Sequence, residues 1–257
     1  IGTVYPIFLD VISSQKISVG PPFYHKLIVP FLIPFLIMMA ISPKLKWIKS
    51  QIEDKIYLIS FLIISIVLAF LVLKNFNQKI LINTILISSA LYLFFITLGD
   101  FFIKKYKNNS QNIAHFGFSL LILSILFNNL FSYEIITNLK VGETFENSKL
   151  KIVFESIDQK KKQNYNAIIA NFSILNSSGV EDRLSPELRI YNQPVIATSE
   201  ADIKTTLISD KFIVINLVQN QDYFNVRYQV KPFMLWIWLS VILISFAGTI
   251  SFLKKRS

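Results

Sequence analysis

Five segments of the sequence are long and apolar enough to cross a lipid bilayer. A membrane-spanning helix needs about 20 predominantly apolar residues, with a range of about 17–25. The predicted spans are Leu27–Ile41, Ile56–Leu73, Ile80–Leu98, Asn112–Phe131 and Phe233–Leu253. The first span is short and contains Pro30 and Pro34, so we expect it to be kinked and to extend toward Phe23.

The distribution of charge supports a membrane protein rather than a nucleic-acid-binding protein. The formal net charge is +10, yet the region from Tyr133 to Pro232 is neutral, with 12 basic and 12 acidic residues. The excess of basic residues therefore lies at the ends of the apolar segments. This is the pattern of the positive-inside rule, not of a continuous phosphate-binding face.

The same basic residues predict the orientation of the spans. Five spans place three basic clusters, ten residues in all, on one face of the membrane: Lys44, Lys46, Lys49 and Lys55, then Lys104, Lys105 and Lys107, then Lys254, Lys255 and Arg256. Segments flanking the membrane on the other face hold only Lys16, Lys26, Lys74 and Lys79. We therefore expect the three clusters on the cytoplasmic or matrix side, and residues 133–232 outside.

The outer region is predicted to be rich in β-structure. Lys149–Glu155 and Tyr223–Val230 alternate apolar and polar residues, and Lys211–Val218 is a more continuous apolar run. Asn176–Gly179 and Asn220–Asp222 carry turn signals. The predicted fold class is a polytopic α-helical membrane protein, with five transmembrane helices and an inserted extracytoplasmic β-rich domain.

Four regions follow from this organisation. Residues 1–26 are predicted to be an extracytoplasmic interfacial segment, 27–132 a four-helix transmembrane region, 133–232 the β-rich domain, and 233–257 the final helix with a basic cytoplasmic tail. Gly20-Pro21-Pro22 is expected to impose a non-helical backbone before the first span. The last strand enters the fifth span without a linker, so we expect the domain to be held at a fixed angle to the bilayer. The chain starts at Ile1 without a signal peptide, which suggests part of a longer or split protein.

His115 is the most informative polar residue, because ionisable residues within spans are candidates for a functional site. It can be a partly hydrated histidine bonded to a carbonyl or a lipid headgroup. It can also be an axial ligand of a haem iron, since neutral imidazole is a common haem ligand. Gly117 and Ser119 could let a porphyrin approach, and Phe116 and Phe118 could stack on it.

His25 cannot share one iron with His115. His25 lies at the outer end of the first span and His115 at the inner end of the fourth, and the hydrocarbon layer between them is about 30 Å thick. Met38 and Met39 lie near the inner face, but a methionine in a span more often packs than ligates. A second axial ligand is therefore expected from outside this chain.

The remaining polar and aromatic residues have simpler interpretations. Trp236 and Trp238 are expected in an interfacial aromatic belt, and Asp100 is expected to pair with Lys104, although it could also accept a proton. The sequence contains no cysteine, no Ser-His-Asp set, no paired carboxylates within a span and no phosphate-binding glycine loop. It therefore lacks the pattern of a self-contained active site.

Four stretches together resemble the C-terminal half of the CcmF family of cytochrome c maturation proteins. They are "GTVYPIFLDVISSQKISVGPPFY", "IAHFGFSLLIL", "LSPELRIYNQ…ATSEADIK" and "VKPFMLWIWLSVILISFAGTISF", in order from Gly2 to Phe252. The resemblance implies a component of a haem lyase complex that attaches haem to apocytochrome c, in the bacterial inner membrane or the mitochondrial inner membrane. Implied partners are the N-terminal half of the same protein, a CcmH-type subunit, a CcmE-type haem chaperone, quinol and membrane lipid.

The resemblance also implies a role for His115, at "AHFG", as an axial ligand of haem b. The second ligand and the external haem-binding histidines are expected in the N-terminal half, so this chain would be incomplete as an enzyme. Quinol would reduce the haem b, which would reduce substrate haem before its attachment. Two alternatives remain: a non-catalytic scaffold that docks assembly partners, and the related assembly factor for multihaem nitrite reductase. A transporter subunit is disfavoured because the spans are nearly free of polar residues at mid-membrane.

Overall fold

The computed structural model describes residues 11–12, 21–45, 55–74, 76, 80–103, 108–148, 150–176, 179, 181–218 and 222–256. The chain forms two compact units. The membrane unit comprises Ile1–Leu123 and Leu239–Ser257, and the β unit comprises Ser124–Trp238. The boundaries pass through two helices, so the end of one helix and the start of another belong to the β unit.

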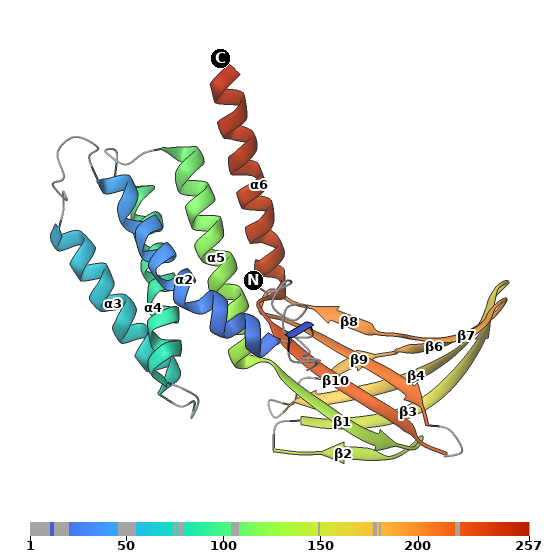
Figure 1. Ribbon diagram of the computed structural model, residues 1–257. Helices are drawn as coiled ribbons and strands as arrows, with labels where there is room; N and C mark the ends of the chain where they lie inside the picture. The colour runs from blue at the N-terminus through green and yellow to red at the C-terminus, as the bar shows by residue number, and fades with distance from the viewer. Residues whose placement is uncertain are drawn as a thin grey trace. The chain divides into compact units, whose positions relative to one another are not determined.

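Five helices within the described residues match the predicted spans. They are α2 (Pro21–Ile41), α3 (Lys55–Leu73), α4 (Ile80–Asp100), α5 (Asn109–Phe131) and α6 (Met234–Arg256). Each is long and apolar enough to cross a membrane. Successive helices run in opposite directions in the membrane unit (Figure 1). The prediction of five transmembrane helices is therefore confirmed, whereas the side of the membrane stays a prediction.

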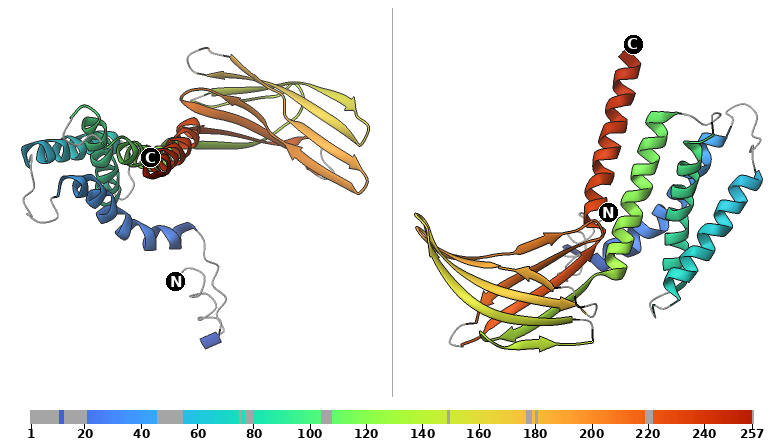
Figure 2. Two further views of the ribbon diagram at one scale, coloured as in Figure 1. Left: turned by 90° about the horizontal axis from the view of Figure 1, so that it is seen from above. Right: turned by 180° about the vertical axis from the view of Figure 1, so that it is seen from behind.

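The start of the first helix differs from the prediction. Pro21 and Pro22 lie in the first turn of α2, and not in a non-helical segment before it. The first turn of a helix tolerates proline because its N–H groups have no intrahelical partner there. Pro30 and Pro34 lie inside α2 as predicted, and the helix bends along its length (Figure 2).

Helix α4 forms the centre of the membrane unit, packed against both α2 and α3. Over half of its apolar segment (56%) is buried within the chain, compared with 17% for α2 and 22% for α3. Ser88, Ser89 and Ala90 are buried on α4. Small buried residues in the middle of α4 allow neighbouring helices to approach closely, which favours the association of helices within a bilayer.

The β unit is a sandwich of two antiparallel sheets. Its strands are β1 (Tyr133–Leu139), β2 (Thr144–Glu146), β3 (Leu150–Lys161), β4 (Tyr165–Asn176), β5 (Glu181–Leu184), β6 (Glu187–Asn192), β7 (Val195–Glu200), β8 (Asp202–Thr205), β9 (Ser209–Leu217) and β10 (Phe224–Pro232). One sheet has the order β1-β10-β9-β8, and the other has the order β2-β3-β4-β6-β7, with β5 paired to β4. Phe154, Phe172, Ile213 and Tyr228 are fully buried in the core that the sheets share.

The three predicted strands exist, with shifted ends. β3 continues beyond Glu155 to Lys161. Both ends of β9 and both ends of β10 lie within two residues of the predicted limits. The turn at Asn176–Gly179 is confirmed by a hydrogen bond from Gly179 N to Asn176 O (2.8 Å). Most of Asn220–Asp222 lies outside the described residues. The pattern did not predict β4, which pairs with β3, β5 and β6, because Asn166 and Asn171 interrupt its apolar run.

Candidate functional site

His115 lies in the second turn of α5, half-buried within the membrane unit. Its imidazole lies beside the backbone of Met39, close to the end of α2 at Ile41. Residue 43 is a proline and has no N–H to donate to the Met39 carbonyl, as a continuing helix would require. His115 thus lies where α5 passes the end of α2.

The imidazole of His115 could act as an iron ligand. In a neutral imidazole one nitrogen carries a proton and the other offers an electron pair. The nitrogen of His115 without a proton could therefore bind an iron, which is a common role of neutral histidine.

His115 also lines a cleft of about 610 Å³ between α5 and α6. Its other lining residues are Asn108, Ser110, Gln111, Ala114, Ala247, Gly248, Ser251 and Lys254. The spacing of the residues on each helix places them on one face. A Cβ added to Gly248 would meet no atom within 4 Å, so this wall of the cleft is open.

The cleft has the chemistry and size expected for a haem. Its volume is within the range of ligand pockets, about 300–1,000 Å³. His115 offers a nitrogen ligand, and Ala114, Ala247 and Gly248 are small where a planar ring would approach. Lys254 places a cation at the same cleft, which suits the carboxylates of a haem.

Gly117 and Ser119 do not have the role that the sequence suggested. Gly117 faces α6, where an added Cβ would lie 3.0 Å from Cγ1 and 3.3 Å from the backbone N of Ile244. Ser119 is fully buried, and its hydroxyl donates to the carbonyl of Phe116 (2.8 Å). Both residues therefore contribute to helix packing. The small residues that line the cleft are Ala114, Ala247 and Gly248.

Phe116 and Phe118 also pack within the helix bundle. The ring of Phe116 lies 5.2 Å, centroid to centroid, from Phe94 and meets Phe101 edge-on at 6.0 Å. The ring of Phe118 meets Phe35 edge-on at 5.8 Å. Neither phenylalanine lines the cleft, so stacking of these rings on a porphyrin stays a prediction.

The other candidate ligands have different positions. The side chain of Met38 is 68% exposed on α2. The backbone of Met39 lies beside His115. The side chain of His25 lies outside the part of the chain that the structure describes. Within the described residues, no group of three or more His, Cys, Asp and Glu side chains is placed to hold a metal ion.

Asp100 pairs with Lys44, not with the predicted Lys104. The ammonium of Lys44 lies 2.7 Å from Oδ1 and 2.6 Å from Oδ2 of Asp100, and both side chains are almost completely buried. Lys104 lies outside the described residues. The sequence could not indicate this pair, because its members are 56 residues apart and belong to different elements.

Tyr57 covers the Lys44–Asp100 pair. Its hydroxyl donates to the carbonyl of Ile96 (3.3 Å), and its ring centroid is 5.6 Å from the Lys44 ammonium. A Cβ on Gly99 would lie 2.2 Å from the Tyr57 hydroxyl oxygen, so glycine leaves the room that Tyr57 occupies. Both charges of the pair are close enough to act electrostatically on His115.

Trp236 and Trp238 both belong to the β unit, at the start of α6. Trp238 is 64% exposed, as expected of a belt residue. Trp236 has an additional contact, because its indole N–H donates to the carbonyl of Leu207 (2.9 Å) in the turn between β8 and β9.

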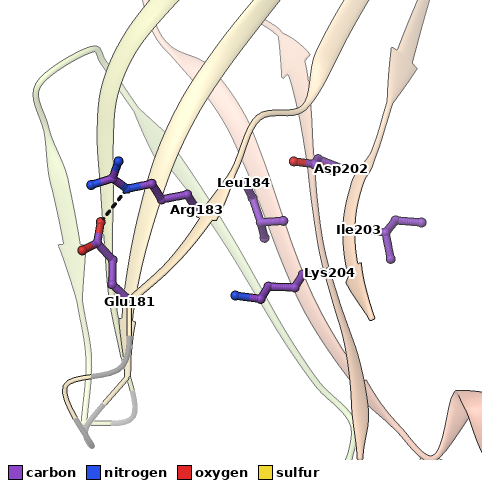
Figure 3. A pocket seen from close by; sticks show the side chains of 6 residues that line it. All are labelled: Glu181, Arg183, Leu184, Asp202, Ile203 and Lys204. Carbon is purple, nitrogen blue, oxygen red and sulfur yellow. Dashed lines mark hydrogen bonds and ion pairs between the residues drawn. The ribbon is translucent and has the colours of Figure 1, made fainter. Parts of the chain in front are cut away.

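A second cleft, of about 550 Å³, lies in the β unit (Figure 3). It is lined by Glu181, Arg183, Leu184, Asp202, Ile203 and Lys204. The charges at its rim pair with one another: Arg183 Nε lies 3.0 Å from Glu181 Oε1, and Lys204 binds the neighbouring Asp182 at 2.7 Å. Lys211 also binds Asp182, at 2.6 Å, so this ion network joins β5 to β8 and β9. This cleft could not be predicted from the sequence, because its two walls come from separate strands.

Burial opposes ionisation of the Asp182 carboxyl, but hydrogen bonds from Lys204 and Lys211 outweigh this effect, so the pKa of Asp182 is lowered below its usual value. The carboxylate form is therefore maintained in the folded β unit.

Comparisons with known proteins agree with this architecture. A family model described as the CcmF C-terminal beta-sandwich matches residues 130–232. The chain is 23% identical to the cytochrome c-type biogenesis protein CcmF of Pseudomonas fluorescens, covering 100% of this chain and 41% of the relative. It is 24% identical to the cytochrome c-type biogenesis protein ccl1 of Rhodobacter capsulatus, covering 99% of this chain and 41% of the relative.

A solved structure titled cytochrome c heme lyase CcmF has the same fold, with a TM-score of 0.70 and 18% sequence identity. The alignment covers 96% of this chain and 41% of that chain. The chain thus spans about two-fifths of the length of these proteins. In sequence and in fold, the chain is similar to the C-terminal part of the CcmF cytochrome c-type biogenesis proteins, and residues 130–232 match the family's C-terminal beta-sandwich.

Proposed function

We propose that this chain is the C-terminal part of a haem lyase component in cytochrome c maturation, in which His115 is an axial ligand of a resident haem b. The observation that carries the proposal is the position of His115. The ring lines the cleft between α5 and α6 and lies beside the backbone of Met39. The related proteins indicate the pathway, since they are a cytochrome c-type biogenesis protein and a cytochrome c heme lyase.

Different residues of the cleft would contact different parts of the haem. The nitrogen of His115 without a proton would ligate the iron, Ala114, Ala247 and Gly248 would admit the flat ring, and Lys254 would neutralise a carboxylate. When bound, the haem would supply one-electron transfer from quinol to ferric substrate haem. We propose that the second axial ligand comes from the N-terminal part that the longer relatives possess.

The surroundings of His115 would set the properties of the site. The Lys44–Asp100 pair places two opposite charges near the imidazole, so it adds little net charge to a site buried in the membrane. The ring of Phe116, which follows His115 in the sequence, packs against Phe94 and Phe101 and adds an apolar contact to the bundle beside the site. A protein controls the redox potential of a haem through ligand identity, burial and nearby charge.

We further propose that the β unit faces the periplasm or the intermembrane space, where apocytochrome c and substrate haem meet. The proposed partners there are a CcmH-type subunit and a CcmE-type haem chaperone. The positive-inside distribution of lysines supports this orientation in either a bacterial or a mitochondrial inner membrane.

The test is a reduced-minus-oxidised absorption spectrum of the complete protein, purified from membranes. We expect His115→Ala to abolish the b-type signal, and His25→Ala, the matched control, to retain it. His115→Gly with added imidazole should recover the signal, because free imidazole can replace the missing ligand. Helical circular dichroism of each variant shows whether the bundle remains folded. An unchanged signal in His115→Ala would contradict the assignment, and a wild-type protein without any b-type signal would favour a scaffold.

A further inference from the structure

The turn between β8 and β9 carries unusual residues. Leu207 and Ile208 form its tip and are 72% and 70% exposed. Two-residue hairpin turns favour Gly, Asn and Asp, which adopt the required backbone conformations and face water. Two large apolar side chains at an exposed tip instead indicate an interaction surface.

The turn is well ordered. The N–H of Thr206 donates to the carbonyl of Ser209 (3.0 Å), and the N–H of Ser209 donates back to the hydroxyl of Thr206 (3.0 Å). These bonds close the hairpin just below its tip. Leu207 and Ile208 are therefore presented by a defined structure.

The tip is bound to the first turn of α6, within the β unit. The N–H of Phe233 donates to the carbonyl of Ile208 (2.7 Å), and the indole of Trp236 donates to the carbonyl of Leu207 (2.9 Å). Phe233 has a φ of 62°, a conformation that bulky residues rarely adopt. The hydrogen bond to Ile208 helps to hold this conformation where the strand β10 changes into the helix.

The two hydrogen bonds have a consequence for solvation. A backbone carbonyl without a partner is costly in an apolar environment. Both carbonyls at the tip are already bonded, so the tip presents mainly its apolar side chains. Trp236 and Trp238 lie at the adjacent helix start, and tryptophan favours the interface between water and the bilayer.

We propose that Leu207 and Ile208 insert into the bilayer interface at the start of α6, so that the β8–β9 turn is a lipid-binding element. Lipid is the occupant that the structure favours, because the tip is continuous with the end of a membrane-spanning helix and its indoles. The inference does not depend on the proposed haem site, since every residue it uses belongs to the β unit.

Site-directed spin labelling can test the proposal. This chain contains no cysteine, so within it a nitroxide attaches only to a cysteine that is introduced. Nitroxides would be placed at Ile208→Cys and, separately, at Leu207→Cys in the complete protein, with any cysteine outside this chain replaced. The protein would be reconstituted in nanodiscs of phosphatidylethanolamine and phosphatidylglycerol. The control is Val195→Cys, because Val195 is another apolar residue of the β unit, 82% exposed at the start of β7.

Power-saturation spectroscopy would compare collisions with oxygen, which concentrates in lipid, and with a water-soluble nickel chelate. Oxygen collisions should dominate at positions 207 and 208, and nickel collisions at position 195. Nickel-dominated collisions at both tip positions would overturn the proposal. Protection from both reagents would also overturn it, because it would show that another protein surface covers the tip.

Discussion

Substitution of Asp100 by Asn should destabilise the membrane unit strongly, because it leaves the buried Lys44 ammonium without its counter-charge. The two groups are in contact at 2.6 and 2.7 Å, with side-chain exposures of 0% and 3%. At an effective dielectric constant of about 20, unit charges 2.6 Å apart attract by about 6 kcal/mol. Removal from water costs several kcal/mol for each ion, so the intact pair contributes little net free energy.

The same balance predicts a large effect when only one partner is removed. The remaining charge keeps its desolvation cost and loses its attraction, which amounts to about 3–5 kcal/mol of unfolding free energy. Lys44→Met should have a similar effect. The double variant Lys44→Met with Asp100→Leu removes both charges, and it should be near neutral or stabilising by about 1–4 kcal/mol.

The measurement is unfolding of the complete protein in detergent, followed by helical circular dichroism. Lys74→Gln is the control, because Lys74 is exposed at the end of α3 and its loss should change the free energy by no more than about 0.5 kcal/mol. If Asp100→Asn costs less than about 1 kcal/mol, the pair is hydrated and the reasoning fails. It also fails if the double variant is as unstable as the sum of the single variants.

Three further substitutions test other parts of the structure. Gly117→Ala should destabilise the contact of α5 with α6 by about 1 kcal/mol or more, because the new Cβ would lie 3.0 Å from Ile244. In the same unfolding assay, Gly248→Ala should be neutral or slightly stabilising, because its Cβ would meet no atom within 4 Å. Equal effects of the two alanines would contradict this packing. Because Asp182 has a lowered pKa, its stabilising contribution is complete above the ordinary value of about 3.9 and is lost as the pH falls through the lower value in the folded state. Asp182→Asn should therefore lower the melting temperature of the β unit near neutral pH and flatten its acid dependence, and an unchanged acid dependence would refute the role of the lysines.

The sequence was sufficient for the transmembrane architecture. The length and hydropathy of a segment decide whether it can cross a bilayer, and both are local properties, so all five spans were predicted close to their observed limits. The exception was the start of α2, where Pro21 and Pro22 have a place in the first helical turn. The alternating strands were also recognised, whereas β4 required knowledge of its partners on both sides.

The candidate site was only partly predictable. His115 could be singled out because an imidazole within a span is rare. Its position beside the Met39 backbone could not be foreseen, because it depends on how separate helices pack. Gly117, Phe116 and Phe118 pack against neighbouring helices and do not line the cleft, because sequence neighbours of a site residue point to different faces of a helix.

Local sequence thus determined which segments enter the membrane and which form strands. The tertiary structure alone decided which helix faces meet, that Asp100 selects Lys44, and that the tip of the β8–β9 turn lies beside the start of α6. The physical reason is that lipid is as apolar as the helices themselves. Hydrophobicity therefore does not choose between the faces of a helix, and close packing and a few polar contacts between distant residues make that choice.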